Sequence, residues 1–579
     1  MRTRGQPRPN RTASLRHDGL VLVLAVLTVV QTAAPAGTAA TPRFEVAEAV
    51  LTSATTYANP FLDVTVTAEV TAPSGRQLTA PGFHDGGNVW RVRWAPDEVG
   101  EWRYATFASD TNNAGLHGRS GSVKCTASPH PGFIRIHPQN PYAFAHADGT
   151  PFFPMGDTCY GLHDDSHITP ALRREYLETR RRQRFNFVRM SVGHSEARAA
   201  ADPAFWAWAG TPAKPDLDRL NPVFFRGLDE LFRDLQGRRM NVELLLLNFY
   251  RRPFTDPSLW TPARERLWLR YVVARYAAFD NLFLWTLANE YETYPEGRYR
   301  LDRPDDVDWA KATARFVRQL DPHRHPVTVH PVISSSTRGV SPRDPIDPPW
   351  RIGGFFGEGE DFDVLSQQTG QSGEGVTWDE RLQCWVGDDP DLVASLRADR
   401  RFGKPVLNTE SGYEYLRGHP TEKKQVHHTD KVRRSAWRIV CAGGYFAAGF
   451  HGTIGHGDIW NRIDTPNRYP FTVRDEGAAN QLGALYDFFT ALPHWRMQPF
   501  ESVTGDLAAA LAEPGRLYVV YLPRGGRMTL DLGAVKGRLN AQWFNPRDGA
   551  FGEPFAATGG GQADFTAPDN NDWALLLIP

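Results

Sequence analysis

The most restrictive feature of this 579-residue chain is a short apolar run, Leu282 to Ala288, that ends directly in Asn289 and Glu290. The run is too short for a typical helix, and it lacks the alternation of a strand with one face in water. A parallel strand that is covered on both faces has such a continuous apolar pattern. We therefore expect a buried parallel strand that places Glu290 at its carboxyl end.

A second stretch, Lys404 to Thr409, has the same character and leads to Glu410. In a (β/α)8 barrel the carboxyl ends of the strands carry the catalytic groups. Two carboxylates at such ends are what glycoside hydrolysis requires, since one protonates the leaving oxygen and the other attacks the sugar or activates water. We predict that Glu290 is the general acid and Glu410 the ionised nucleophile; Glu292 and Glu414, further into the same loops, are the alternatives.

Residues 133–495 alternate apolar strands with amphipathic helices. The pattern predicts eight strands, at Phe152–Met155, Phe185–Met190, Val242–Leu247, Leu282–Ala288, Val327–His330, Phe362–Ser366, Val406–Thr409 and Ala448–Thr453. Helices are predicted at Ala171–Arg182, Phe224–Gln236, Ala263–Ala278, Trp309–Leu320, Lys431–Phe446 and near Gln481–Leu492. Eight strands separated mostly by helices favour a (β/α)8 TIM barrel over an open sheet. No Gly-x-Gly-x-x-Gly follows the first strand, which weakens a dinucleotide-binding alternative.

The segments on either side of the barrel have β character, so the chain is expected to be multidomain. Short alternating strands and turns over residues 43–128 predict an immunoglobulin-like β-sandwich, in which Asp85 and Asp110 are interpreted as turn residues. Residues 498–579 again show short apolar runs separated by turns, and this pattern predicts a small C-terminal β-sandwich.

Residues 1–40 have the layout of a secretory signal: arginines, an apolar run from Gly19 to Val30, and an alanine-rich stretch before the cleavage site. Because the run is shorter than a membrane span, we expect a secreted or cell-envelope protein without stable membrane insertion after cleavage; an uncleaved anchor is the alternative. The formal net charge of −1 gives no indication of nucleic-acid binding.

The four cysteines, Cys125, Cys159, Cys384 and Cys441, are compatible with up to two disulfides or with buried free thiols. Their wide spacing fits no zinc pattern, and the histidines and aspartates show no tight ligand spacing. We therefore expect no metal and no cofactor.

Further polar and aromatic residues lie at or near the predicted strand ends. Arg189 stands inside an apolar strand, where an unpaired charge would be costly, so we expect it to lie beneath Glu410 and keep it ionised. The other candidate substrate contacts are Asn289, Asp157, His330, Gln368, His451 and Trp460.

Several motifs resemble those of the apiosidase-like catalytic family. The first barrel strand, Phe152 to Thr158, is similar to the opening strand of that family. Tyr57 to Phe61 and Gly82 to Gly87 resemble the immunoglobulin-like domain found before certain secreted glycosidases, and Trp543 to Gly549 resembles a C-terminal β-domain that carries a collagen-binding label. The Asn289-Glu290 pair looks like the signature of a large clan of retaining glycosidases, in which the asparagine contacts the sugar 2-hydroxyl.

The resemblance implies a secreted retaining glycoside hydrolase that acts on plant or microbial polysaccharides or oligosaccharides. Family members often have a tryptophan soon after the first strand, where this chain has Cys159 and Tyr160, so apiose specificity is not carried over. The alternative is a non-catalytic carbohydrate-binding or cell-surface adhesion protein on the same scaffold. A lyase or a transglycosylase is a third hypothesis.

Overall fold

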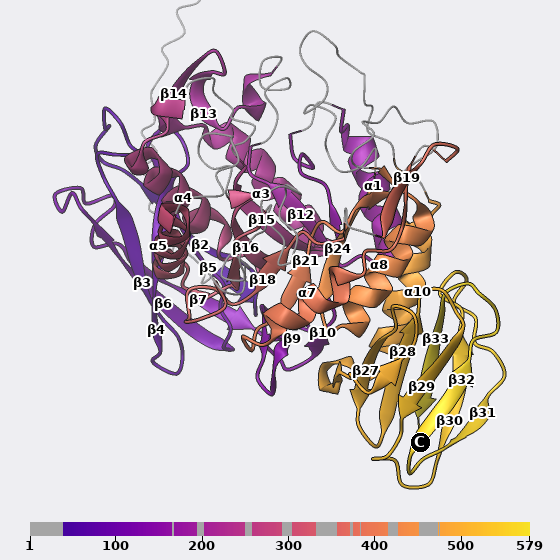
Figure 1. Cartoon of the computed structure of the whole chain (residues 1–579). Helices are drawn as coiled ribbons and strands as arrows, with labels where there is room; N and C mark the ends of the chain where they lie inside the picture. The colour runs from indigo at the N-terminus through magenta and orange to yellow at the C-terminus, as the bar shows by residue number, and fades with distance from the viewer. Residues whose placement is uncertain are drawn as a thin grey trace, which may run out of the picture. The chain divides into compact units, whose positions relative to one another are not determined.

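A parallel barrel of eight strands forms the centre of the chain (Figure 1). The computed structural model describes residues 39–164, 167–193, 202–248, 257–291, 304–331, 356–370, 375–382, 384–414, 426–450, 473 and 475–578. The barrel strands are β11 (Met155–Thr158), β12 (Phe187–Ser191), β15 (Asn241–Leu247), β16 (Leu282–Ala288), β17 (Val327–Thr328), β18 (Leu365–Gln367), β21 (Val406–Asn408) and β24 (Tyr445–Phe450). The predicted strand at Leu282–Ala288 is therefore confirmed, and all its side chains are buried.

The barrel is nearly closed. Parallel ladders connect the strands in the order β17, β16, β15, β12, β11, β24, β21 and β18. Between β17 and β18 two separate bonds complete the circuit: Asp363 N donates to Val327 O at 3.0 Å, and Thr328 Oγ1 donates to Val364 O at 2.7 Å. The predicted TIM-like barrel is confirmed.

Helices connect most of the barrel strands and cover them. They are α1 (Pro170–Arg182), α3 (Pro222–Gly237), α4 (Pro262–Tyr276), α5 (Pro304–Leu320), α7 (Asp391–Arg400), α8 (Thr429–Cys441) and α10 (Ala478–Thr490). The polar residues before α1, α3 and α4, namely Thr169, Asn221 and Thr261, each accept a hydrogen bond from a backbone N–H of the first turn, and a proline follows each of them. These two signals start a helix locally, because the cap satisfies an unpaired donor and proline has its φ preset.

Several predicted element boundaries were wrong: β17 ends inside its predicted range, β18 begins inside its predicted range and ends after it, and two further cases have a clear local cause. The first barrel strand begins at Met155, because Pro154 separates it from β10 (Pro151–Phe152), which pairs antiparallel with β9 (Asn140–His146) instead. The helix predicted to reach Phe446 ends at Cys441, where Gly443 takes a φ of +79° and terminates it. The following strand β24 therefore starts before the predicted one.

Aromatic side chains fill the amino-terminal end of the barrel. A three-stranded sheet of β8 (Ile134–His137), β9 and β10 lies in the same core as the barrel strands. Phe283 of β16 meets Phe144 at 5.2 Å, Phe152 at 5.5 Å and Phe187 at 5.3 Å between ring centroids. This packing covers one end of the barrel and leaves the carboxyl ends of the strands for polar groups.

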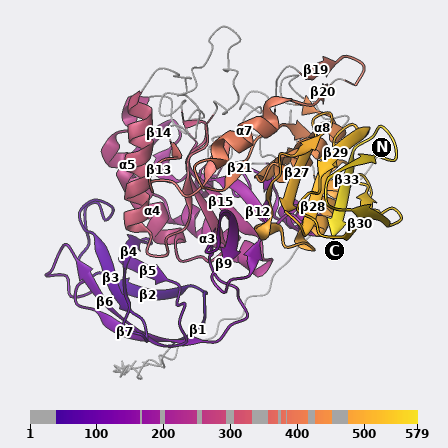
Figure 2. The ribbon, with the colours of Figure 1, turned by 60° about the horizontal axis from the view of Figure 1, so that its bottom comes forward.

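The N-terminal region is antiparallel β-structure (Figure 2). Its strands are β1 (Ala39–Pro42), β2 (Ala47–Thr52), β3 (Val66–Thr71), β4 (Gln77–His84), β5 (Val89–Trp94), β6 (Gly100–Ala108) and β7 (Ser120–Thr126). The first half of β4 pairs with β3 and its second half with β5, so β4 is shared between two parts of the sheet. A core that includes Val70, Trp94 and Trp102 draws residues from both parts, as in a sandwich.

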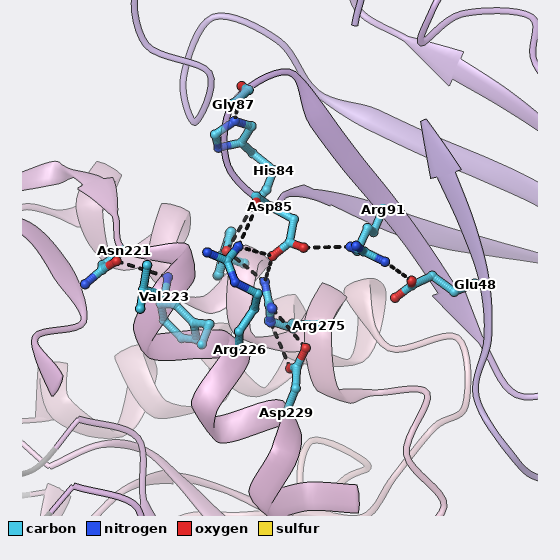
Figure 3. Close-up of polar contacts among 12 residues, drawn as sticks. Glu48, His84, Asp85, Gly87, Arg91, Asn221, Val223, Arg226, Asp229 and Arg275 are labelled. Atoms are coloured by element: carbon cyan, nitrogen blue, oxygen red, sulfur yellow. Dashed lines mark hydrogen bonds and ion pairs between the residues drawn. The ribbon is translucent and has the colours of Figure 1, made fainter. Parts of the chain in front are cut away.

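Buried ion pairs bind this region to the barrel helices (Figure 3). Asp85, in the turn after β4, lies 2.6 Å from Arg91 Nε and 3.0 Å from Arg275 Nη1 of α4. Asp229 of α3 accepts hydrogen bonds from Arg275 at 2.9 Å and from Arg93 of β5 at 2.7 Å. Asp85 is thus a turn residue, as predicted, and it also links two parts of the chain.

The C-terminal region consists of two antiparallel sheets. One contains β25 (Gln498–Pro499), β27 (Ala509–Glu513), β28 (Leu517–Leu522), β33 (Trp573–Ile578), β30 (Arg538–Phe544) and β31 (Phe555–Thr558), and the other β26 (Val503–Thr504), β29 (Arg527–Asp531) and β32 (Gln562–Thr566). The larger sheet packs on α8 and α10 (Figure 1), where Trp437 stacks on Tyr521 at 5.3 Å. Arg433 also binds Asp572 with two hydrogen bonds of 3.0 and 2.8 Å.

All four cysteines are buried and free, which decides between the two predicted alternatives. The chain divides into two units at Ala39, and residues 1–38, which include most of the predicted signal, lie outside the described residues. In the described part of the chain, no helix is both long enough and apolar enough for a membrane crossing.

Candidate active site

Both predicted catalytic glutamates lie directly beyond the carboxyl ends of barrel strands. Glu290 follows β16 and Glu410 follows β21, and their exposed fractions are only 8% and 5%. Glu290 has a φ of +47°, in the left-handed region that non-glycine residues rarely occupy. Such backbone conformations cluster at functional sites, where the surrounding structure holds them in place.

Gln368 connects the two carboxylates. It follows β18, and its Nε2 donates to Glu290 Oε1 at 3.2 Å and to Glu410 Oε2 at 3.1 Å. Since both oxygens bind the same nitrogen, they can be no further apart than the sum of these two distances. The structure therefore brings together the two glutamates and a third predicted residue, although sequence reasoning did not foresee that Gln368 bridges them.

Arg189 of β12 lies beneath this pair with no exposed surface. Its Nη1 donates to Glu410 Oε1 at 3.0 Å, and its Nη2 donates to Asn289 Oδ1. Burial alone would lower the pKa of Arg189, but Tyr160, Glu410 and other acidic neighbours raise it well above its usual value. The guanidinium therefore stays charged beside Glu410, in the position that the sequence predicted.

Tyr160 is a contact of Glu410 that sequence reasoning missed as a site residue. It lies just after β11, and its hydroxyl donates to Glu410 Oε1 at 2.5 Å and lies 3.3 Å from the Tyr413 hydroxyl. The available signal was its place immediately beyond a barrel strand, where a phenol can reach the centre of the site. Arg189 and Tyr160 together give Glu410 Oε1 two donors, which fix the orientation of the carboxylate.

His330 contacts the backbone of one glutamate and approaches the other. Glu290 N donates to His330 Nδ1 at 3.4 Å, and His330 Nε2 lies 3.9 Å from Glu410 Oε1. Burial and the nearby Arg189 charge lower the pKa of His330 well below its usual value. A neutral imidazole that accepts at Nδ1 carries its proton on Nε2, on the side of Glu410.

Asp157 is not brought to the glutamates. It lies within β11, and its Oδ2 accepts hydrogen bonds from Tyr176 at 2.9 Å and from Arg180 Nε at 2.5 Å, both on α1. Glu414, one of the alternatives, accepts from Ala478 N at 2.8 Å and from Thr429, away from the bridged pair. Glu292, His451 and Trp460 lie outside the described residues.

No group of three or more histidine, cysteine, aspartate or glutamate side chains within the described ranges could hold a metal ion. The arrangement that remains is two buried carboxylates on two strand ends, joined by an amide and held from below by a guanidinium. Two carboxylates whose surroundings differ can take separate acid and nucleophile roles.

Three family models match successive parts of the chain. The model "Apiosidase-like, catalytic domain" matches residues 138–496. A "Domain of unknown function (DUF5060)" matches residues 40–109, and a "Putative collagen-binding domain of a collagenase" matches residues 504–578. No curated protein matches the chain.

Solved structures of similar fold include two proteins from Bacteroides vulgatus ATCC 8482. One, described as a "putative glycoside hydrolase", is 19% identical with a TM-score of 0.67, over 93% of this chain and 100% of that one. The other, a glycoside hydrolase of family 5, is 17% identical with a TM-score of 0.59, over 77% and 94% of the two chains. At these identities the likeness concerns the fold, which is that of a glycoside hydrolase.

Proposed function

The chain belongs to the apiosidase-like catalytic family, and from that premise we propose that it is a retaining glycoside hydrolase with Glu290 as acid/base and Glu410 as nucleophile. The observation that carries the proposal is the Gln368 amide, which binds an oxygen of each carboxylate. A binding scaffold has no need of two buried carboxylates held so close, because their charges repel each other.

The carboxylate separation is what distinguishes the two stereochemical outcomes. The two bridged oxygens are at most about 6.3 Å apart, which limits the separation without fixing it; inverting enzymes keep about 6.5–9.5 Å between the carboxyl groups to admit a water. Retaining enzymes place them at about 5–5.5 Å, so that the second carboxylate attacks the sugar directly.

The proposed reaction has two steps. Glu290, protonated, gives its proton to the glycosidic oxygen while Glu410 attacks the anomeric carbon, so the leaving group departs as an alcohol and a glycosyl ester forms. Glu290, now ionised, removes a proton from water, which attacks the anomeric carbon and releases Glu410. Both glutamates end in their starting protonation states.

The surrounding residues have supporting roles in this proposal. Arg189 and Tyr160 keep Glu410 ionised and fix its orientation through Oε1. Asn289, whose Oδ1 is held by Arg189, presents its amide N–H groups to the sugar 2-hydroxyl. We propose further sugar contacts from His330 and Gln368, and from His451 and Trp460, which were predicted from the sequence alone; Asp157, bonded to α1, is not among them.

The proposed substrate is a plant or microbial polysaccharide or oligosaccharide, met outside the cell after removal of the N-terminal signal. Neither apiose specificity nor collagen binding is part of the proposal. Tyr160 occupies part of the wall where family members often have tryptophan, and a phenol bonded to the nucleophile makes a different surface for a sugar.

Turnover of a panel of defined polysaccharides and aryl glycosides tests the function. We expect Glu410→Gln to abolish turnover while circular dichroism stays unchanged, and Glu290→Ala to slow substrates with poor leaving groups far more than activated aryl glycosides. Glu414→Gln is the matched control, because this buried glutamate is bonded elsewhere.

Proton NMR of the first-formed product then reports the anomeric configuration. An inverted product would exclude the covalent step. Full activity of Glu410→Gln would remove the assignment altogether, and saccharide binding without turnover in the wild type would favour the non-catalytic alternative.

A further inference from the structure

Glu243 is a third carboxylate, directly beneath the proposed catalytic pair. It lies in β15 with no exposed surface, and Arg189 is its partner in the ladder between β12 and β15. Its Oε1 accepts a hydrogen bond from Thr286 at 2.8 Å and lies 3.3 Å from Arg189 Nε. The reaction described above does not use it.

The Arg189 guanidinium is shared between two carboxylates. Nε faces Glu243 and Nη1 faces Glu410 at 3.0 Å, so one buried cation serves two acidic groups. Burial raises the pKa of Glu243, and the neighbouring Glu410 adds to this, although Arg189 opposes it. Glu243 Oε2 is also buried and makes no hydrogen bond to any described residue.

Such an arrangement couples the two acidic groups. When two carboxylates share one cation, ionisation of either makes ionisation of the other more costly, and they titrate as a pair. A guanidinium bound to Glu410 alone would stabilise the Glu410 carboxylate more strongly and so make it a weaker nucleophile. Glu243, which binds the same guanidinium, reduces its attraction for Glu410.

We propose that Glu243 is a positioning residue for the proposed reaction: through Arg189 it competes with Glu410 for one guanidinium, and its charge sets how strongly that guanidinium attracts the nucleophile. The inference rests on the function proposed above. It concerns a residue inside a barrel strand with no exposed surface, which is linked to the nucleophile through Arg189.

Other titratable groups also face Glu410. The Tyr160 hydroxyl contacts it directly, and Tyr413 contacts Tyr160. His330 is kept neutral near pH 7 by its lowered pKa, and Glu290 is connected to Glu410 through Gln368. These groups are the same in a variant that changes Glu243, so a change in titration can be assigned to that residue.

The variant Glu243→Gln tests the proposal, since it keeps the shape and the Oε1 acceptor but removes the charge. We expect the acid limb of the kcat/KM profile to move to lower pH by about one unit. Glu265→Gln is the matched control, because Glu265 lies in helix α4, outside the barrel strands, and accepts a hydrogen bond from Trp309 of α5. An unmoved acid limb in a folded Glu243→Gln protein would overturn the inference.

A second variant covers the case in which Glu243→Gln does not fold. Thr286→Val removes the hydroxyl that donates to Glu243, which weakens the ionised form and leaves more of the guanidinium to Glu410. We expect a smaller shift in the same direction. A shift toward higher pH would contradict the proposal.

A titration that needs no substrate separates this inference from the proposed function. In protein labelled with carbon-13 at the glutamate carboxyl, the spectrum of Glu410→Gln identifies the Glu410 signal. We expect that signal to titrate at lower pH in Glu243→Gln than in the wild type. Identical curves would refute the role of Glu243 even if the protein is an active glycosidase. A shifted curve would support that role even if the protein turns over no glycoside.

Discussion

Replacing Asp229 with alanine would test how the N-terminal region is held on the barrel. Asp229 is 2% exposed and accepts two hydrogen bonds from Arg275 at 2.9 Å and one from Arg93 at 2.7 Å. Without it, two buried guanidiniums face each other across the site of the lost carboxylate. Removing one partner of a buried ion pair costs about 3–5 kcal/mol, so we expect the free energy of unfolding of Asp229→Ala to be lower than that of the wild type by this amount.

The same ion pairs determine how the effect depends on pH. Burial raises the pKa of Asp229, but Arg93 and Arg275 more than compensate and hold it below the usual value of 3.8. A carboxyl group with a lowered folded-state pKa stabilises the fold above its unfolded pKa and loses that contribution as the pH falls through the folded value. The difference between wild type and Asp229→Ala should therefore be complete at pH 7 and shrink below pH 4.

Urea unfolding at pH 7, followed by tryptophan fluorescence, would measure the effect, because Trp90, Trp94 and Trp102 lie in the N-terminal core. Asp487→Ala is the matched control: Asp487 also pairs with an arginine, Arg184, but the two side chains are 56% and 53% exposed. Exposed pairs contribute about 0–1 kcal/mol. If both variants lost the same small amount, the buried network would not hold the two parts together.

Three further predictions concern single side chains. Tyr160→Phe removes the hydroxyl bonded to Glu410. Because a hydrogen bond to a charged group contributes about 1.5–3 kcal/mol, kcat should fall about 10- to 100-fold with little change in folding, as stopped assays on the best substrate would measure. Burial lowers the pKa of Lys431 to about 7, so above that pH the unfolded protein binds more protons at this residue than the folded protein does. Thermal scans from pH 7 to 10 should therefore show the wild type gaining stability relative to Lys431→Met. Burial raises the pKa of Glu414 to about 7, so the wild type should lose stability relative to Glu414→Gln as the pH rises from 4.5 to 7, and parallel curves would contradict this.

The strand ends were predictable because they depend on local patterns. Leu282 to Ala288 forms the predicted strand, since a short continuous apolar run is typical of a strand buried on both faces. Burial on both faces also means that the sequence does not indicate to which side of the strand each side chain points. Asp157 and Arg189 both stand in buried barrel strands, yet Asp157 binds α1 while Arg189 binds Glu410. Continuous burial leaves no alternation from which the two directions could be told apart.

The partners of the site residues depend on register and on distant segments, and the sequence carries little signal for either. The Glu243 contact with Arg189 follows from the pairing of β12 with β15, and the Gln368 bridge requires three strand ends to meet. Likewise the ion pair between Asp229 and Arg93 joins residues 136 positions apart.

The helix α8 joins the candidate site to the C-terminal region, which bears on what that region does. Lys431 on α8 donates to the backbone carbonyls of Gly370 and Ser411, in the loops that carry Gln368 and Glu410. Two residues later, Arg433 binds Asp572 of the C-terminal region. The larger C-terminal sheet shares a hydrophobic core with the barrel, so that face is covered and cannot bind an external partner. A ligand of the C-terminal region would have to use other surfaces, such as the sheet of β26, β29 and β32, while the covered face supports the helix that holds the two loops.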